Sequence, residues 1–447
     1  MSTIQKTKLP PGPKTKIPLG HLFPFQRDSL AFLKKIADEF GDIVHFKVGP
    51  IRVILLNHPD YIKEVLSTQN SNFVKGRPLK MAKELIGEGL LTSEGEFHKR
   101  QSRIIQPAFH RKMLDSYAPA MTECTVNLMN TWKDGIQVDM FEEMIRMSTA
   151  ISGKTLFNVD TEHETPEINQ ALQDVMSLFG RISLPFSEWL FKLPLRSTRK
   201  FYNAKARLDD TINRIIAERR QSKIEHEDLL SLLLHAQDSR EGMSDQQIRD
   251  EALTLFLTAF DTTSIALTWT WYLLSQNPEA EKTLHEELDR VLQGRIPTVE
   301  DLPQLKYTRM VLGESMRIYP PIYLITRQAL EDFEIGPYVV PADTIVLISP
   351  YLIHHDARFH HDPETFNPYA WEEHSQGISS KYEYFPFSRG PRACIGEPYA
   401  WLEGVLVLAT IAQSWRLKLV PGHPVELLQL INLRPKYGMM MELERRK

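Results

Sequence analysis

The sequence is poor in cysteine: its 447 residues include only two, Cys124 and Cys394. Two thiols cannot form a disulfide framework, so the composition favours a reducing compartment, and we expect a cytoplasmic protein. Residues 1–19 are polar and proline-rich, without an apolar run as long as that of a signal peptide. Because no later apolar run reaches the length of a bilayer span, we expect no membrane span.

The sequence also lacks a large excess of one charge, a flexible linker and an internal repeat. Its 53 basic and 57 acidic residues give a formal net charge of −4, so nucleic acid or an anionic membrane is not expected as the main partner. With 42% hydrophobic residues, the chain can bury a large core. We therefore predict one catalytic domain over residues 21–447, preceded by a proline-rich segment at residues 1–20.

Helical periodicity dominates the rest of the sequence. A capping-box pattern begins at Ser244, and nothing breaks the helical pattern that follows until Asn277 and Pro278. Further helices are predicted at residues 29–40, 59–66, 94–109, 307–319 and 399–414. Strands are predicted at residues 43–48, 52–56, 338–341 and 344–348, with a tail hairpin from residues 416–420 and 437–443. Residues 71–93 lack a clear period and are predicted to be a long loop. The expected fold class is mainly α with a small β lobe.

The stretch around Cys394 carries the strongest chemical signal. It places a cysteine at the start of an apolar helix, after a segment with Gly390, Pro391 and Arg392 that cannot be regular helix. Free N–H groups and the positive end of the helix dipole would stabilise a thiolate there, which is a strong metal ligand. Arg392 would supply a cation for an anionic group on whatever the sulfur binds.

This stretch resembles the cysteine loop of the cytochrome P450 family of haem-thiolate monooxygenases. The family pattern Phe-x-x-Gly-x-Arg-x-Cys-x-Gly is met by Phe387, Gly390, Arg392, Cys394 and Gly396. The resemblance implies the cytochrome P450 fold, with haem b (iron protoporphyrin IX) between the long helix and the cysteine helix. It also implies that Cys394 is the proximal ligand of the iron, where thiolate donation favours O–O cleavage.

A second motif lies in the long helix, where residues 258–263 resemble the oxygen-activation motif of the family. Asp261 and Thr262 match its acid and alcohol, and Ala259 replaces the usual glycine beside the haem. The resemblance implies that Thr262 holds a water by a hydrogen bond and that Asp261 connects it to solvent for proton delivery. Alternatively, Thr262 only bonds the carbonyl four residues earlier, and Asp261 is an exposed helix acid.

Glu314 and Arg317 lie three residues apart on a predicted helix and can form a bidentate ion pair. They resemble the Glu-x-x-Arg element of the family, a structural pair that supports the cysteine loop. Many members add a third basic residue to this pair, but here Ala370 occupies that place. Arg327 matches a family position that contacts a haem propionate.

Residues 94–109 resemble, in part, the family helix that crosses one edge of the haem. His98 stands where many members have tryptophan and is a candidate donor to a propionate, whereas Ser102 stands where arginine or histidine is common. This helix and the next one contribute to a basic face that would attract an acidic electron-transfer protein. Its residues are Lys99, Arg100, Arg103, Arg111 and Lys112.

The resemblance implies a soluble, monomeric enzyme of bacterial type that inserts one atom of O2 into a lipophilic small molecule. Hydroxylation or epoxidation of a fatty acid, terpenoid or steroid would fit. Since no Rossmann glycine pattern is present, electrons are expected from a separate ferredoxin or flavodoxin with its NAD(P)H reductase. The apolar connection at residues 178–195 would cover the substrate pocket.

Two other classes stay open from the sequence: a peroxide-driven or isomerising haem-thiolate enzyme, and a non-catalytic haem-binding sensor. A second metal site has little support. His354, His355, His360 and His361 cluster in sequence, but we expect them to be solvated or to act as caps.

Overall fold

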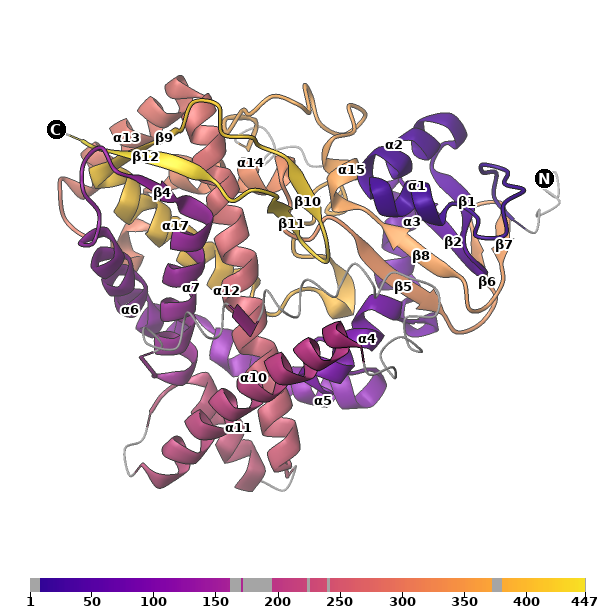
Figure 1. Ribbon diagram of the computed structural model, residues 1–447, viewed down its shortest axis with the longest axis horizontal. Coiled ribbons are helices and arrows are strands. Elements are labelled where there is room, and N and C mark those ends of the chain that lie inside the picture. Colours follow the sequence, from indigo (N-terminus) through magenta and orange to yellow (C-terminus); the bar gives the residue numbers. More distant parts are fainter. Residues whose placement is uncertain are drawn as a thin grey trace.

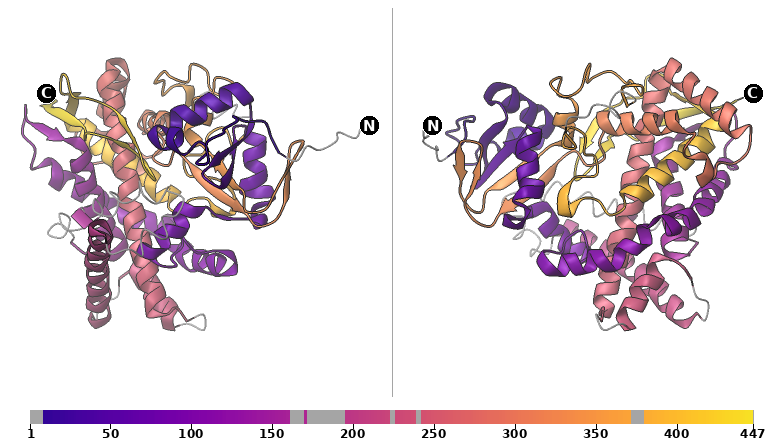
Figure 2. Two further views of the ribbon diagram at one scale, coloured as in Figure 1. Left: turned by 45° about the vertical axis from the view of Figure 1, so that its right-hand side comes forward. Right: turned by 180° about the vertical axis from the view of Figure 1, so that it is seen from behind.

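The computed structural model describes residues 9–160, 170–171, 195–222, 226–238, 242–371 and 380–446. A helical body lies on one side and a small β lobe on the other, with the N-terminal end beside the β lobe (Figure 1). Figure 2 shows the same division from two further sides. The predicted fold class is thus confirmed. The expected pocket cover at residues 178–194 lies outside the described residues.

The long helix α12 (Asp245–Gln276) runs through the helical body (Figure 1). Its 32 residues give a length of about 48 Å. It begins at the predicted capping box, where the Ser244 hydroxyl accepts the Gln247 N–H and the Gln247 side chain accepts the Ser244 N–H. By length and composition α12 could cross a membrane, but 78% of its apolar window is buried inside the protein. It is the central core helix.

Seven further helices in the described part of the helical body share one large hydrophobic cluster with α12. They are α6 (Arg111–Met129), α7 (Met140–Phe157), α10 (Arg196–Gln221), α11 (Leu229–Asp238), α13 (Pro278–Leu292), α14 (Lys306–Ile318) and α17 (Glu397–Ser414). The remaining α-helices of the described residues are α1 (Leu22–Arg27), α2 (Ser29–Phe40), α3 (Pro59–Lys63), α4 (Arg77–Ile86), α5 (Gly95–Ile105) and α15 (Pro350–His354).

The β lobe is a five-stranded sheet in the order β1-β2-β8-β5-β3. Its strands are β1 (Ile43–Val48), β2 (Ile51–Leu56), β3 (Phe73–Lys75), β5 (Ile325–Ala329) and β8 (Ile345–Ile348). β2 and β8 are parallel and the other pairs antiparallel. Both faces are apolar because alternate residues of β2 enter different clusters: Ile54 packs on one side, and Leu55 packs with α2 on the other.

Three smaller sheets complete the fold. The C-terminal sheet has the order β4-β12-β9 and consists of β4 (Gln137–Asp139), β9 (Trp415–Leu419) and β12 (Met440–Arg445). The predicted pairing within the tail is confirmed, but a second hairpin of β10 (Leu427–Gln429) and β11 (Leu433–Pro435) is inserted between its two strands. β6 (Phe333–Ile335) and β7 (Tyr338–Val340) form the last pair.

The prediction of a long loop at residues 71–93 is wrong, because this segment contains β3 and α4. Gly76 is the N-cap of α4, Pro78 lies in its first turn and Gly87 follows its last residue. These residues delimit the helix instead of preventing it. The helix buries one stripe of side chains, which consists of Met81, Ala82, Leu85 and Ile86.

Candidate active site

α12 opens to accessible space at one place along its middle. From Ile248 to Trp271, all residues of this fully described helix are buried except four. These four are half-buried: Thr258, Ala259, Asp261 and Thr262. The window therefore coincides with the acid, the alcohol and the small residue that the sequence pattern singled out.

Cys394 lies just before α17, at the end of the short helical turn Gly390–Arg392. Its side chain has accessible surface, although many atoms of the surrounding protein lie close to the sulfur. Burial raises the pKa of the Cys394 thiol to about 11, although the N–H groups of Gly396 and Glu397 oppose this rise. The N–H groups at the helix start thus favour a thiolate as expected, but burial outweighs them. A metal cation bound to the sulfur would stabilise the thiolate and lower the pKa of Cys394.

The loop before the sulfur has a fixed backbone. Gly390 has φ +79°, and a Cβ there would lie 2.0 Å from the Leu66 carbonyl oxygen, so only glycine fits. The Cys394 N–H donates to the Phe387 carbonyl over 2.9 Å. Phe387 is half-buried and its ring lies 6.0 Å from that of Trp401. A Cβ at Gly396 would lie 3.8 Å from the Cys394 sulfur, so a longer side chain would crowd the thiol.

A buried histidine supports the same loop. His354 Nε2 accepts the Phe385 N–H over 3.1 Å, and burial lowers the pKa of His354 well below its usual value. His360 is also buried, and its Nε2 lies 3.0 Å from the Glu383 carbonyl. The expected solvated or capping role is therefore wrong for these two histidines, because each bonds the backbone that leads into the cysteine loop.

Glu314 and Arg317 form the predicted bidentate pair, with two N–O distances of 2.8 Å. Arg317 also donates to the backbone carbonyls of His354, Pro363 and Thr365. Glu314 accepts the Asn367 N–H over 3.0 Å and the Trp371 indole N–H over 3.1 Å. Backbone and indole groups thus complete the cluster at the place where the sequence has Ala370.

A group of basic side chains gathers between β3, β5, α5 and the cysteine loop. Burial is the main reason why the pKa of Arg327 falls to about 10 and that of Lys75 to about 7, and the nearby Arg392 lowers both further. His98 is buried and its pKa falls to about 3 for the same two reasons. Arg392 forms an ion pair with Glu94 and donates to the Ser93 carbonyl over 2.8 Å. This gathering of basic groups, whose positive charge the protein itself disfavours, fits a ligand that carries carboxylates.

Lys75 was missed by the sequence analysis. It is 7% exposed, and its ammonium group donates to the carbonyls of Leu90 and Leu91. It lies inside the segment that was predicted to be a loop. The period-two pattern of a strand, which puts Phe73 and Lys75 on one face, was the signal that could have found it.

The carboxylate of Asp261 is bonded by two side chains of the C-terminal hairpin, Asn432 and Arg434. Burial raises the pKa of Asp261, while the Arg434 cation and the Asn432 amide oppose this rise. Asp261 is thus an enclosed acid rather than an exposed one. The Thr262 hydroxyl donates to the Thr258 carbonyl over 3.0 Å, as in the alternative reading of this residue.

The predicted basic face is partly neutralised. Lys99 pairs with Glu96 over 2.6 Å, and Arg111 lies 3.8 Å from Asp115. The Lys112 ammonium group lies 3.7 Å from a carboxylate oxygen of Glu227. All of these pairs are exposed to solvent, so water screens them and the cations stay accessible.

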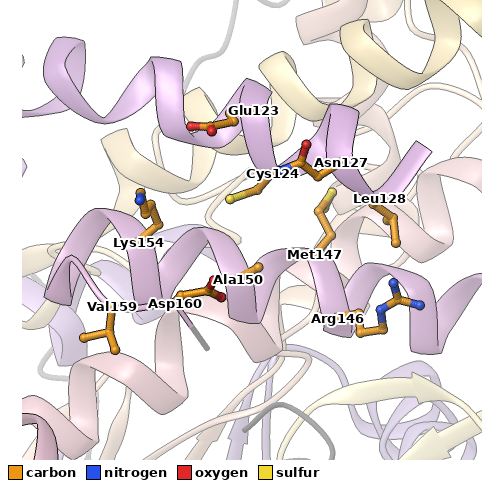
Figure 3. Close-up of a pocket in the computed structure, with 10 residues that line it drawn as sticks. All are labelled: Glu123, Cys124, Asn127, Leu128, Arg146, Met147, Ala150, Lys154, Val159 and Asp160. Carbon is orange, nitrogen blue, oxygen red and sulfur yellow. The ribbon is translucent and has the colours of Figure 1, made fainter. Parts of the chain in front are cut away.

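A separate hollow of about 170 Å³ lies between α6 and α7, around Cys124 (Figure 3). Burial raises the pKa of Cys124 to about 11, which keeps this thiol neutral and weakly nucleophilic. The residues that line the hollow include neither Cys394 nor any residue of the α12 window. It is not part of the candidate active site.

Comparison with known proteins gives one consistent result. The profile of the family described as Cytochrome P450 matches residues 10–440. Cyclooctatin synthase of Streptomyces melanosporofaciens is 38% identical over 91% of this chain and 89% of its own length. Cyclooctat-9-en-7-ol 5-monooxygenase of the same species is 36% identical over 90% and 88%. Pentalenene oxygenase of Streptomyces avermitilis is 32% identical over 91% of each.

Proposed function

The chain belongs to the cytochrome P450 family and is a monooxygenase that depends on haem, and from this premise we propose that its substrate is a terpenoid. Three relatives that align over about nine tenths of the chain support this choice, since two are named as oxygenases of pentalenene and cyclooctat-9-en-7-ol and the third as cyclooctatin synthase. The substrate would enter the space beside the α12 window and leave its reacting carbon near Thr262.

The observation that carries the site assignment is that, between Ile248 and Trp271 of α12, accessible surface is confined to the four window residues, and that the Cys394 side chain is also accessible. The residues present fit haem b. Cys394 would ligate the iron, Ala259 would lie against the ring, and Phe387 and Gly396 would flank the sulfur. The buried Lys75, His98 and Arg327, together with the half-buried Arg392, would hold the propionates.

Haem supplies the activation of O2 that insertion of one oxygen atom into a C–H or C=C bond requires. The chain's own residues supply protons and exclude bulk water. Thr262 would turn its hydroxyl from the Thr258 carbonyl toward a water in the window. Asp261, the neighbouring acid, would pass protons to that water and be reprotonated from solvent. Glu314 and Arg317 bond the backbone of His354, Pro363, Thr365 and Asn367, and through His354 they would support the cysteine loop without taking part in the chemistry.

The proposed electron donor is a separate ferredoxin or flavodoxin with its NAD(P)H reductase, and the proposed location is the cytoplasm. The exposed cations of α5 and α6 would attract the acidic surface of such a donor. Weak, salt-dependent binding of the donor to a monomer is expected, because exposed charges act over about 10 Å and are screened by salt.

The reduced, CO-bound protein tests the cofactor assignment. We expect the strongly red-shifted Soret band of a sulfur-ligated iron, and we expect Cys394→Ser to lose it while Cys124→Ser keeps it. A wild-type spectrum without this band after haem reconstitution would contradict the assignment.

A ligand screen tests the substrate class. Pentalenene and cyclooctat-9-en-7-ol, each compared with a fatty acid of similar carbon number, are added to the oxidised protein, and the low-to-high-spin shift is recorded. We expect shifts at micromolar terpenoid and weaker ones with the fatty acids. A response to fatty acids alone would overturn the terpenoid proposal and leave the monooxygenase assignment intact.

A further inference from the structure

The hairpin of β10 and β11 lies beside the middle of α12 (Figure 1). The Trp269 indole N–H, from α12, donates to the Leu433 carbonyl over 2.9 Å. On the other side of the hairpin, the Tyr323 hydroxyl donates to the Leu430 carbonyl over 2.9 Å. The turn is therefore anchored both to the core helix and to the segment before β5.

Three side chains close a ring of hydrogen bonds between this hairpin and α12. One oxygen of the Asp261 carboxylate accepts from the Asn432 amide and the other from the Arg434 guanidinium. Arg434 Nε in turn donates to Asn432 Oδ1 over 2.9 Å. Asn432 is 2% exposed, and the side chains of Arg434 and Asp261 are 11% and 16% exposed. Both carboxylate oxygens are thus engaged by the hairpin.

Arg434 supplies the main charge at this ring that opposes protonation of Asp261. Burial raises the pKa of Asp261, and the guanidinium is the first of the two groups that oppose the rise. Arg434 also acts on Glu142 of α7, whose pKa is raised by burial and lowered in part by this guanidinium. The guanidinium also lies 5.7 Å from the centre of the Phe141 ring. α7 therefore encloses the outer side of the ring.

We propose that Asn432 and Arg434 are positioning residues for proton delivery, so that the C-terminal hairpin fixes the place and the charge of the relay acid. This inference rests on the proposed function. In the resting state the hairpin holds both oxygens of the carboxyl group. A proton from solvent water binds one oxygen of the Asp261 carboxylate, and this oxygen exchanges its hydrogen bond with Asn432 for one with water. The proton then passes from Asp261 to the water held by Thr262. The carboxylate returns to the hairpin with no net change.

The test compares Arg434→Gln, Arg434→Lys and Asn432→Ala with the wild type, each also in an Asp261→Asn background. Lys436→Gln is the matched control, because this lysine lies just after β11 but pairs with Glu426 on the exposed part of the hairpin. NAD(P)H oxidation with a ferredoxin and its reductase is followed with and without pentalenene and cyclooctat-9-en-7-ol. The readouts are hydrogen peroxide per NAD(P)H, the solvent isotope effect and the pH profile.

We expect Arg434→Gln and Asn432→Ala to raise the peroxide fraction at least twofold and to increase the solvent isotope effect. In Arg434→Gln, the inflection in the pH profile should move to higher pH, because the pKa of Asp261 rises when the cation is lost. Arg434→Lys should recover most of the wild-type behaviour, and Lys436→Gln should match the wild type. In the Asp261→Asn background, the hairpin substitutions should add nothing.

Two results would overturn the inference: wild-type peroxide yield and isotope effect in both hairpin variants, or equal changes with and without Asp261. The second result would mean that the hairpin acts only on the shape of the pocket. The red-shifted Soret band of the CO complex is recorded for every variant. Its absence in the wild type would contradict the proposed function, whereas its presence in all variants with unchanged proton readouts would contradict the positioning role alone.

Discussion

The hydroxyl of Thr262 is one of the few polar groups of α12 that reaches the window, and it is held by a single bond to the Thr258 carbonyl. We expect Thr262→Ala to lower severalfold the share of NAD(P)H electrons that reaches product, because a water in the window loses its hydrogen-bond partner. Thr268→Ala is the control, since this threonine makes the same kind of bond but is fully buried. Product and peroxide per NAD(P)H are measured, and unchanged coupling in Thr262→Ala would refute the relay.

Lys75 is a buried basic residue beside the proposed haem site. It would compensate for Ser102, which stands where arginine or histidine is common in the family. We expect Lys75→Gln to speed the transfer of haem to excess apomyoglobin by three- to tenfold, because a propionate loses a charged partner. Lys80→Gln is the control, since Lys80 is an exposed lysine that bonds Gln328. Equal transfer rates in both variants would remove Lys75 from the propionate site.

Glu403 is fully buried in α17, and burial raises its pKa to about 8. The folded protein therefore binds a proton that the unfolded chain, with an ordinary pKa near 4.5, releases. The stability associated with this proton is present at low pH and is lost as pH rises from about 4.5 to about 8. We expect Glu403→Gln to flatten this fall, with a gain of a few kcal/mol above pH 8. Urea unfolding of the wild type and of Glu403→Gln at pH 6 and pH 8.5 gives the change in unfolding free energy with pH. An equal change in the two proteins would contradict the prediction.

At the scale of residues, short-range spacing predicted the Glu314–Arg317 pair, which the structure confirms, and it also indicated Cys394 and the adjacent Asp261 and Thr262. Each of these patterns lies within a few positions of the sequence. The partners of Asp261 lie 171 and 173 residues away, so no local pattern could reveal them. The burial that raises the pKa of the Cys394 thiol was also not predictable from a local pattern, because it comes from the assembled core.

At the scale of elements, the connection after α15 matters because it completes the Glu314–Arg317 cluster. We expect Trp371→Phe to lower the free energy of unfolding by about 1.5–3 kcal/mol, since a buried carboxylate loses an N–H donor. Tyr369→Phe, at an exposed position, should cost less than about 0.5 kcal/mol. Urea denaturation of the purified variants gives both values. Equal losses would show that the indole contributes packing only.

The elements themselves were largely predictable. α2 and the β1–β2 pair begin and end close to their predicted positions, because their apolar periods are clear and glycines flank them. α4 was missed because Gly76, Pro78 and Gly87 were taken as breakers, although glycine and proline also mark helix ends. The β10–β11 hairpin was missed because its strands have three residues each, too short to show a period.

At the scale of the whole molecule, β12 is the central strand that joins β4 to β9 and so ties the chain end to α7. We expect Met441→Ala, at a fully buried position of β12, to cost about 2–5 kcal/mol of unfolding free energy. The neighbouring Met440→Ala, at a half-buried position, should cost clearly less. Thermal and urea unfolding report the two losses. A similar cost for both would mean that this sheet contributes little to the core.

The order of strands in the β lobe also affects how the protein is made. β8 separates β2 from β5, and its residues pair with β2 across about 290 positions of sequence. A ribosome must therefore release most of the polypeptide before the edge of β2 finds its neighbour, and an open apolar edge invites aggregation in the meantime. Cys394 is synthesised later still, so the enzyme can bind its haem iron only when translation is nearly complete. Slower synthesis at lower temperature should therefore raise the yield of soluble protein.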